Sequence, residues 1–403
     1  MVTMINKKRA FFFAVSVAVV FSLIGGALFG QATQRNNVFR YLSIFTEVFD
    51  LVRNNYVEAV ASDQLMDGAF NGVTDAIDEF SYYVPPAQMS AYRGDTDTED
   101  NGIGVVVTKR FGYAYVIAAT PGSPAAKAGV ERGDFIEKVD GKPTQKLAIW
   151  QVRNLLHTGK AVQLQVLRGG QTKRDTFTIQ QTSYHPLALT TQQFGGVAYV
   201  KIPYFEKGTS EQLKAALDKV RTSGTRKLIV DVRENAGGDV DEAIASADEL
   251  LTSGMITSIE GRHVDAKRWQ ADRATDYDGA VEVLTDNSTA SGAEIFAAAV
   301  HGNGRGKLVG VSTYGKAVVQ KFIQLPSGGG VFMTVGHYTA PDMKPIKDGG
   351  VKPDVVVDLT VQAIRERDIR KGNTTTPKPD DDLILKKALE LYTEPQQASK
   401  KAA

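Results

Sequence analysis

From residue 184 onward, short apolar segments alternate with segments of helical character, and this alternation most constrains the fold. The stretches Val197 to Ile202 and Leu228 to Val232 are short and apolar, as buried strands are. Longer helix-forming runs occur at Ser210 to Arg221 and Val240 to Leu251. Strands that alternate with helices pack in layers, because each element must bury its apolar face against another. The sequence therefore predicts an α/β layer architecture here.

The composition excludes several classes of function. The 403 residues are 42% apolar, enough for a large core spread over two or three domains. With 47 basic and 46 acidic residues, the formal net charge of +1 gives no support for a nucleic-acid partner. The chain has no cysteine, which excludes disulfides and thiol catalysis. Its 5 histidines lack the spacing of metal ligands, so no metal and no other cofactor is expected.

Two short runs offer a nucleophile and a base without histidine. Ser291 lies in Thr-Ala-Ser-Gly-Ala-Glu-Ile, and Lys316 lies in Tyr-Gly-Lys-Ala-Val-Val-Gln. A serine hydroxyl is a weak nucleophile at neutral pH, and a lysine held neutral can take its proton. Apolar neighbours at residues 317–319 favour a neutral Lys316, since burial lowers the pKa of a lysine. Gln320 could hold the amine by a hydrogen bond, so the pattern predicts a Ser291/Lys316 dyad.

The surroundings of Ser291 predict an oxyanion hole. The helix-forming run 293–300 follows the serine, which places it at a helix N-terminus with free N–H groups and a positive dipole end. Gly292 lets an acyl oxygen approach its N–H closely. A second donor is expected from Gly237 and Gly238, where an apolar strand ends in a turn with permissive backbone.

Two alternatives stay open for these motifs. Ser291 could simply cap its helix, with Lys316 a surface charge and the glycine pair an ordinary turn. A phosphate-binding loop is the other, since Gly310 to Lys316 fits Gly-x-x-x-x-Gly-Lys and Asp231 ends an apolar strand. Ala317 then stands where a serine or threonine would reach the metal, and no apolar helix follows. An NTPase is therefore the less favoured interpretation.

The same motifs resemble the carboxyl-terminal processing proteases, also called tail-specific proteases. That family shows a serine-containing run before Glu-Ile, then Phe-Gly-Lys-Gly-x-Val-Gln, which implies Ser291 as nucleophile, Lys316 as base and Gln320 as its support. Its Asp-Leu-Arg-x-Asn-x-Gly-Gly element matches residues 231–238. The resemblance thus implies an oxyanion hole made by Gly292 and the Gly237-Gly238 turn.

The resemblance covers nearly the whole soluble chain. Further matches lie at residues 349–354 and in the helical segment 45–80. The departures from the family pattern keep small residues, at Ala236, Gly292, Ala293 and Ala317. The resemblance implies a serine endopeptidase that forms an acyl-enzyme. It also implies a core of the crotonase and Clp protease spiral type, and N-terminal helices that join subunits in a homo-oligomer.

A set of segments between residue 102 and about 180 resembles a PDZ domain of the bacterial protease type. The set includes a glycine-containing strand start at 102–105, Pro-Gly-Ser-Pro at 121–124 and a helix near Ala148 to His157. PDZ domains add an extended peptide as a strand and hold its terminal carboxylate with backbone N–H groups. The expected clasp is Gly102, Ile103, Gly104 and Val105. Proteins or peptides with free C-terminal tails are then the partners, and a catalytically silent PDZ scaffold or a structural glycine turn is the alternative.

The N-terminus predicts export. Lys7-Lys8-Arg9 precedes an uncharged stretch from Ala10 to Gly30, long enough to cross a hydrocarbon core of about 30 Å. Basic residues favour the cytoplasmic side, so the remaining chain is expected to face the periplasm or another extracytoplasmic space. The rival interpretation is a cleaved signal peptide, with a weak cleavage site at Gly30-Gln31-Ala32.

The chain is thus expected to have five parts. They are an anchor or signal segment at 1–36, a helical segment at 37–95, a PDZ domain at 96–182, an α/β protease core at 183–371, and a tether with a last helix at 372–403.

Overall fold

The computed structural model describes residues 38–92, 102–168, 174–272, 277–358 and 378–393, together with residues 15 and 275. The chain divides into two compact units, Met1–Phe70 and Asn71–Ala403. Among the described residues, no helix combines the length and the apolar character needed to cross a membrane. The predicted anchor, residues 10–30, falls outside the described residues apart from residue 15.

The described part of the first unit is helical. Residues 38–55 form a helix, and α2 (Ser62–Asp75) runs across the boundary between the units. The first of these helices carries an apolar stripe at helical spacing, formed by Leu42, Phe45, Val48, Phe49 and Val52. Of these side chains, Leu42, Phe45, Val48 and Val52 are exposed in the single chain.

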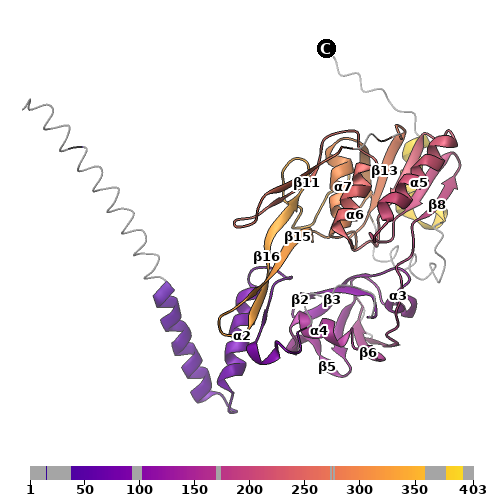
Figure 1. The fold of residues 1–403 in the computed structure, drawn as a ribbon. Coiled ribbons are helices and arrows are strands. Elements are labelled where there is room, and N and C mark those ends of the chain that lie inside the picture. Colours follow the sequence, from indigo (N-terminus) through magenta and orange to yellow (C-terminus); the bar gives the residue numbers. More distant parts are fainter. Residues whose placement is uncertain are drawn as a thin grey trace, which may run out of the picture. The chain divides into compact units, whose positions relative to one another are not determined.

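The centre of the second unit is a six-stranded, mostly parallel sheet (Figure 1). Its order is β17 (Val355–Val356), β14 (Gly306–Gly310), β13 (Ala280–Thr285), β10 (Lys227–Asp231), β9 (Val197–Lys201) and β8 (Thr190–Phe194). Only β8 is antiparallel to its neighbour. The sheet confirms the α/β architecture, and its parallel strands align their C-terminal ends along one edge.

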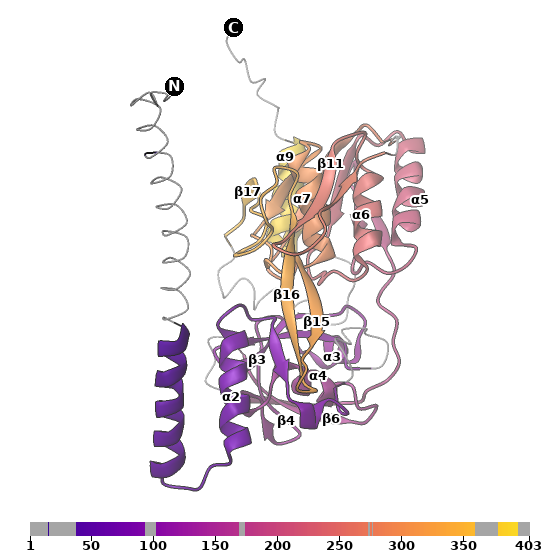
Figure 2. The ribbon, with the colours of Figure 1, turned by 60° about the vertical axis from the view of Figure 1, so that its left-hand side comes forward.

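Helices cover both faces of this sheet. One face packs against α5 (Thr209–Thr222), α6 (Val240–Asp248) and α7 (Gly292–Gly302), and the other against α9 (Leu383–Thr393) (Figures 1 and 2). In β10, Leu228 and Val230 join the first core while Ile229 joins the second. Successive strand residues point to opposite faces, so burial on both sides explains why this strand is continuously apolar in sequence.

A second sheet carries a long hairpin beside the core (Figure 2). The hairpin strands are β15 (Val318–Gln324) and β16 (Gly330–Thr339). The other strands of this sheet are β1 (Tyr82–Val84), β11 (Met255–Glu260) and β12 (Lys267–Gln270). Because Lys316 lies two residues before β15 and β1 follows residues 78–81, this sheet fixes both segments at the site described below.

The third sheet belongs to the PDZ-like segment. Its strands are β2 (Val105–Arg110), β3 (Tyr113–Ala119), β4 (Phe135–Val139), β5 (Lys142–Pro143), β6 (Val162–Leu167) and β7 (Arg174–Ile179). The helices of this segment are α3 (Pro124–Ala128) and α4 (Ile149–Leu155), and it contains the short 3₁₀ helix η3 (Thr144–Lys146). Two further 3₁₀ helices lie outside this segment: η1 (Pro86–Gln88) precedes it, and η4 (Pro379–Asp381) precedes α9. β2 is the end strand of this sheet, so one of its edges has no strand partner among the described residues.

Candidate active site

Ser291 stands at the N-terminus of α7, immediately before its first residue, Gly292. Its backbone has φ 53° and ψ −123°, a positive φ that residues other than glycine rarely adopt. Such strain persists only where the surrounding structure determines it, and it is frequent at active sites. Here the Ser291 N–H donates to Oε2 of Glu294 at 3.1 Å. The predicted helix start is present, and its serine is held in a strained conformation.

Glu294 joins this turn to the segment that carries Lys316. Its fully buried carboxyl group accepts the N–H groups of Ser291 and Lys316 at the same oxygen, Oε2, at 3.1 and 2.7 Å. The other oxygen accepts Oγ1 of Thr313 at 2.5 Å and the N–H of Gly315 at 2.6 Å. Two nitrogens bonded to one oxygen cannot lie farther apart than the sum of their bond distances. The structure therefore brings the backbones of Ser291 and Lys316 together.

Sequence reasoning did not single out Glu294. A glutamate three residues after an N-cap serine is the capping-box pattern, and that signal could have found it. The glycine-rich stretch 349–354 also has a role here. Gly350 has φ 63°, and a Cβ built on it would lie 2.6 Å from Oε1 of Glu294 and closer still to Thr313. A side chain at residue 350 would therefore push into this carboxyl group.

Lys316 and Gln320 both face Phe80. The Nζ of Lys316 lies 5.7 Å from the centroid of the Phe80 ring, and Nε2 of Gln320 donates to the Phe80 carbonyl at 3.1 Å. Lys316 is partly buried, with Gly315 and Ala317 fully buried on either side. The structure thus places the predicted base, Lys316, and its predicted support, Gln320, around Phe80. Sequence reasoning had not assigned Phe80 to the site.

The turn that contains the two glycines packs against the nucleophile. A Cβ built on Gly237 would lie 2.7 Å from Cβ of Ser291 and 3.0 Å from the Gly292 nitrogen. Gly237 has φ 110° and Gly238 has φ 108°, values that glycine alone adopts readily. The close approach and the dihedral angles both require glycine at residue 237.

The two glycines differ as hydrogen-bond donors. The N–H of Gly237 donates to Oδ1 of Asn235 at 2.8 Å, whereas no described group accepts the N–H of Gly238 or Gly292. The Gly237 carbonyl accepts from Phe205 at 2.9 Å, so the Gly238 N–H in the same peptide plane points the opposite way. Of the two predicted donors in this turn, the structure favours Gly238.

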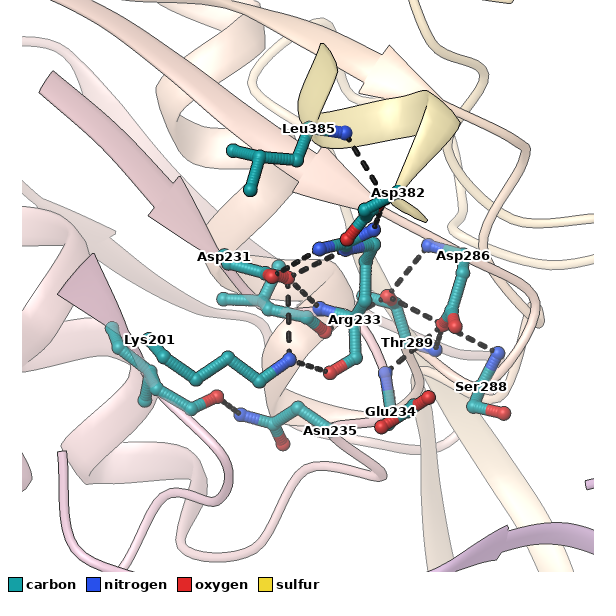
Figure 3. Close-up of polar contacts among 12 residues, drawn as sticks. Lys201, Asp231, Arg233, Glu234, Asn235, Asp286, Ser288, Thr289, Asp382 and Leu385 are labelled. Carbon is teal, nitrogen blue, oxygen red and sulfur yellow. Dashed lines mark hydrogen bonds and ion pairs between the residues drawn. The ribbon is translucent and has the colours of Figure 1, made fainter. Parts of the chain in front are cut away.

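A buried network of charges lies behind the turn (Figure 3). Arg233 donates to both oxygens of Asp231, at 3.0 and 2.6 Å, and to Asp382 at 2.7 Å. Lys201 donates to Asp231 at 3.2 Å and to the Arg233 carbonyl at 2.5 Å. Burial would raise the pKa of Asp231, but Arg233 and Lys201 hold it well below its usual range. The aspartate therefore stays ionised and fixes Arg233, the residue at which the turn begins.

Asp286 holds the turn and the nucleophile segment together. Its buried Oδ1 accepts the N–H groups of Glu234, Ser288 and Thr289, at 3.1, 2.9 and 3.0 Å. Its Oδ2 pairs with Nη1 of Arg132 at 2.9 Å. Arg132 belongs to the PDZ-like segment, so one of its side chains reaches a carboxylate that shapes both turns. Nothing in the local sequence around residue 286 distinguished it from an ordinary turn.

The predicted clasp is buried at the start of β2. Ile103 donates its N–H to the Leu156 carbonyl at 3.3 Å, at the end of α4. Gly104 has φ 75°, and a Cβ built on it would collide with Ser123. Gly102 packs against the ring of His157, and Val105 begins the end strand. The structure thus places residues 102–105 between α4 and the turn before α3, beside the open edge of β2.

Known proteins resemble this chain along most of its length. The sequence profile of peptidase family S41 matches residues 196–357, and a PDZ domain profile matches residues 115–168. The carboxy-terminal-processing protease of Bartonella bacilliformis is 31% identical over 361 residues, which are 87% of this chain and 83% of that protein. This chain belongs to the carboxy-terminal-processing protease family. The resemblance inferred from its motifs is confirmed.

Other known proteins resemble the chain in sequence or in fold. The carboxy-terminal processing protease CtpA of Bacillus subtilis is 27% identical over 370 residues, 88% of this chain and 78% of that protein. The solved structure of the photosystem II D1 C-terminal processing protease shares the fold, with a TM-score of 0.63 and 24% identity over 78% of this chain and 92% of that chain. This carboxy-terminal-processing protease is therefore a serine peptidase with a PDZ domain and an α/β core.

The ionisation of Glu294 predicts a pH dependence for this protease. Burial raises the pKa of Glu294 to about 7, against four hydrogen bonds that favour the carboxylate. Below that pH the carboxyl group carries a proton, although all four of its neighbouring groups are hydrogen-bond donors. The hydrogen bonds to the segments of Ser291 and Lys316 are then weakened. Ionisation with rising pH should therefore raise kcat/KM through about pH 7.

A comparison with Glu294→Gln isolates this effect from the titration of other groups. The glutamine is neutral at every pH, so the ratio of wild-type to variant kcat/KM should rise from about pH 6 to about pH 8. Groups that titrate alike in both proteins cancel in this ratio. A ratio that stays constant over this interval would contradict the role given to Glu294.

Proposed function

We propose that this protease captures proteins by their free C-terminal tails and cleaves them through an acyl-enzyme on Ser291. The Oγ of Ser291 attacks the carbonyl carbon of the scissile bond while Nζ of Lys316 takes the hydroxyl proton. Lys316 then gives that proton to the leaving amine. Water next attacks the acyl carbon while Lys316 takes its proton, and Lys316 returns that proton to Oγ of Ser291 as the acyl group leaves. Gln320 orients Lys316 from its place on the Phe80 carbonyl.

The observation that carries this proposal is the shared oxygen of Glu294. Its Oε2 accepts the N–H groups of Ser291 and Lys316, which draws nucleophile and base into one site. The donors proposed for the oxyanion of the tetrahedral intermediate are the N–H of Gly292, the residue after Ser291, and the N–H of Gly238, which follows the glycine that packs against Ser291. A crotonase- and Clp-protease-like spiral core remains part of the prediction.

Labelling with a serine-directed fluorophosphonate tests the function. The wild-type protein should be labelled and Ser291→Ala should not, because the reagent reacts with an activated serine. A catalytically silent PDZ scaffold would leave both unlabelled. Nucleotide binding by the unlabelled protein would instead support the NTPase alternative.

The PDZ domain is proposed to bind the substrate's C-terminal carboxylate. β2 has an open edge for strand addition, and the clasp of residues 102–105 lies at its start. Because the Ile103 N–H already donates to the Leu156 carbonyl, the other N–H groups of this stretch are the donors proposed for the carboxylate. Amidation of the last residue of a long substrate removes a charged hydrogen-bond acceptor, with an expected loss of about 1 to 3 kcal/mol in binding. Steady-state cleavage of matched free-acid and amidated substrates measures this, and equal KM values would exclude carboxylate capture.

Changing the substrate is a cleaner test than changing the clasp. Ile103 is fully buried and Gly104 has no room for a Cβ, so aspartate at either position would also disturb the PDZ fold. Short peptides that cannot reach the clasp separate two roles of the domain. If the domain only tethers substrates, they are cut slowly and independently of added tail peptide. If it gates the site, added tail peptide should accelerate their cleavage.

The protease is further proposed to be anchored in a membrane and to face the periplasm or another extracytoplasmic space. The support is the uncharged stretch from Ala10 to Gly30 behind three basic residues. Removal of the residues before Asn36 should release an active enzyme from the membrane fraction, because all proposed catalytic residues lie beyond it. A mature N-terminus near Ala32, measured by mass spectrometry, would instead establish a cleaved signal peptide.

A homo-oligomer is also proposed. The exposed apolar stripe on the helix of residues 38–55 is the surface available for it, since its large apolar side chains would be covered in an assembly.

A further inference from the structure

The C-terminal helix α9 is packed as part of the core. Ile384, Leu385 and Ala388 are buried against the sheet, in the same cluster as Ile229 of β10 and Leu284 of β13. At the far end of the helix, the Tyr392 hydroxyl donates to the Leu228 carbonyl at 2.8 Å. The helix therefore lies along the strands that lead to the active-site turns, with its N-terminal end at the charge network.

Asp382, the residue before α9, has two partners. Its Oδ1 accepts the N–H of Leu385 at 3.1 Å, which caps the helix, and accepts Nη1 of Arg233 at 2.7 Å (Figure 3). Asp382 and Arg233 are 149 residues apart in sequence. Burial alone would raise the pKa of Asp382, but the charge and hydrogen bond of Arg233 lower it, so the side chain is an anion.

The pair matters for the turn that follows Arg233. Glu234, the next residue, has φ 63°, a strained conformation for a residue other than glycine. Two anchors keep it: Asp286 accepts the N–H of Glu234 itself, and Asp382 holds the side chain of Arg233, the residue before it. Lys201 and Arg233 are balanced by Asp231 and Asp382, so without the last carboxylate the buried network carries a net positive charge.

We propose that Asp382 is a positioning residue of this protease, which orients the oxyanion turn through Arg233 and so links the N-terminal end of α9 to the active site. The inference rests on the proposed function, because it assumes that the turn ending at Gly238 stabilises the oxyanion. Asp382 touches no reacting atom. It acts by fixing the backbone that presents the Gly238 N–H.

Asp382→Asn separates this role from helix capping. Asparagine caps helices as well as aspartate does, so α9 should stay docked while the charge opposite Arg233 is lost. Displacement of the turn should lower kcat about 10- to 100-fold with little change in KM. A peptide aldehyde, which adds Oγ of Ser291 to its carbonyl carbon and leaves an oxyanion, should lose affinity by a similar factor.

Two control variants match this change. Asp380→Asn removes the charge of an exposed aspartate two residues away, and it should leave kcat unchanged. Tyr392→Phe removes the hydrogen bond at the other end of α9, so it should lower the melting temperature and leave kcat per active site unchanged. Titration of active sites with the fluorophosphonate normalises all rates to folded enzyme.

The outcomes separate this inference from the function beneath it. If Asp382→Asn matches Asp380→Asn in kcat and in aldehyde affinity, Asp382 only attaches the helix and the inference is wrong. If Asp382→Asn and Tyr392→Phe lower the melting temperature equally and neither changes kcat, the inference is likewise wrong. A wild-type protein that is not labelled at Ser291 would overturn the proposed function itself.

Discussion

Ser291→Ala and Lys316→Ala should each abolish proteolysis, and the double variant should be scarcely slower than either single variant. A nucleophile and its base act as a unit, so the loss of one removes nearly all the benefit of the other. We expect kcat to fall roughly 10⁴-fold or more in each case. Cleavage of a long substrate, with melting temperatures measured in parallel, checks this.

Lys316→Arg is the matched control for the base. Arginine keeps the positive charge and much of the length, but it is effectively never neutral and cannot accept the proton. It should therefore be as inactive as the alanine variant and remain folded. Near-normal turnover by either Lys316 variant would mean that another group is the base.

Gly237→Ala should lower kcat by about 10²- to 10³-fold, the loss expected when oxyanion stabilisation fails. The added Cβ would lie 2.7 Å from Cβ of Ser291 and 3.0 Å from the Gly292 nitrogen, so the nucleophile and one oxyanion donor must move. The positive φ of 110° adds backbone strain. Single-turnover kinetics should place the loss in acylation, with substrate binding little affected.

Gly224→Ala controls for the strain. Gly224 also has a positive φ, 75°, but a Cβ built on it meets no atom within 4 Å. This variant should lose some stability and keep its kcat. Equal activity of the two variants would show that Gly237 does not pack against the nucleophile as described.

The motifs that sequence reasoning found share one property, which is that each is local. Ser291 precedes a helix-forming run, Lys316 and Gln320 lie in one short segment, and the glycine pair ends an apolar strand. Local patterns of this kind report backbone conformation and burial directly. The helix start at Ser291 appears in the structure as expected, and the strand predicted at 228–232 appears at 227–231.

The residues that sequence reasoning missed act across long distances in the chain. Phe80 meets Lys316 and Gln320, and Arg132 meets Asp286. A buried polar contact between distant segments leaves no periodicity or spacing in the sequence, because each partner alone looks like an ordinary polar or aromatic residue. Such contacts become visible only when the chain is folded.

The sequence by itself determined the α/β architecture, the family and the proposed dyad of Ser291 and Lys316, because these depend on patterns within short segments. Only the tertiary structure decided that the N–H of Gly237 is bonded to Asn235. It also decided that Glu294 binds the backbones of both Ser291 and Lys316, and that Asp382 pairs with Arg233. The reason is physical. Hydrogen bonds depend on the positions of single atoms, and those positions are set by the packing of helices and strands that are far apart in the chain.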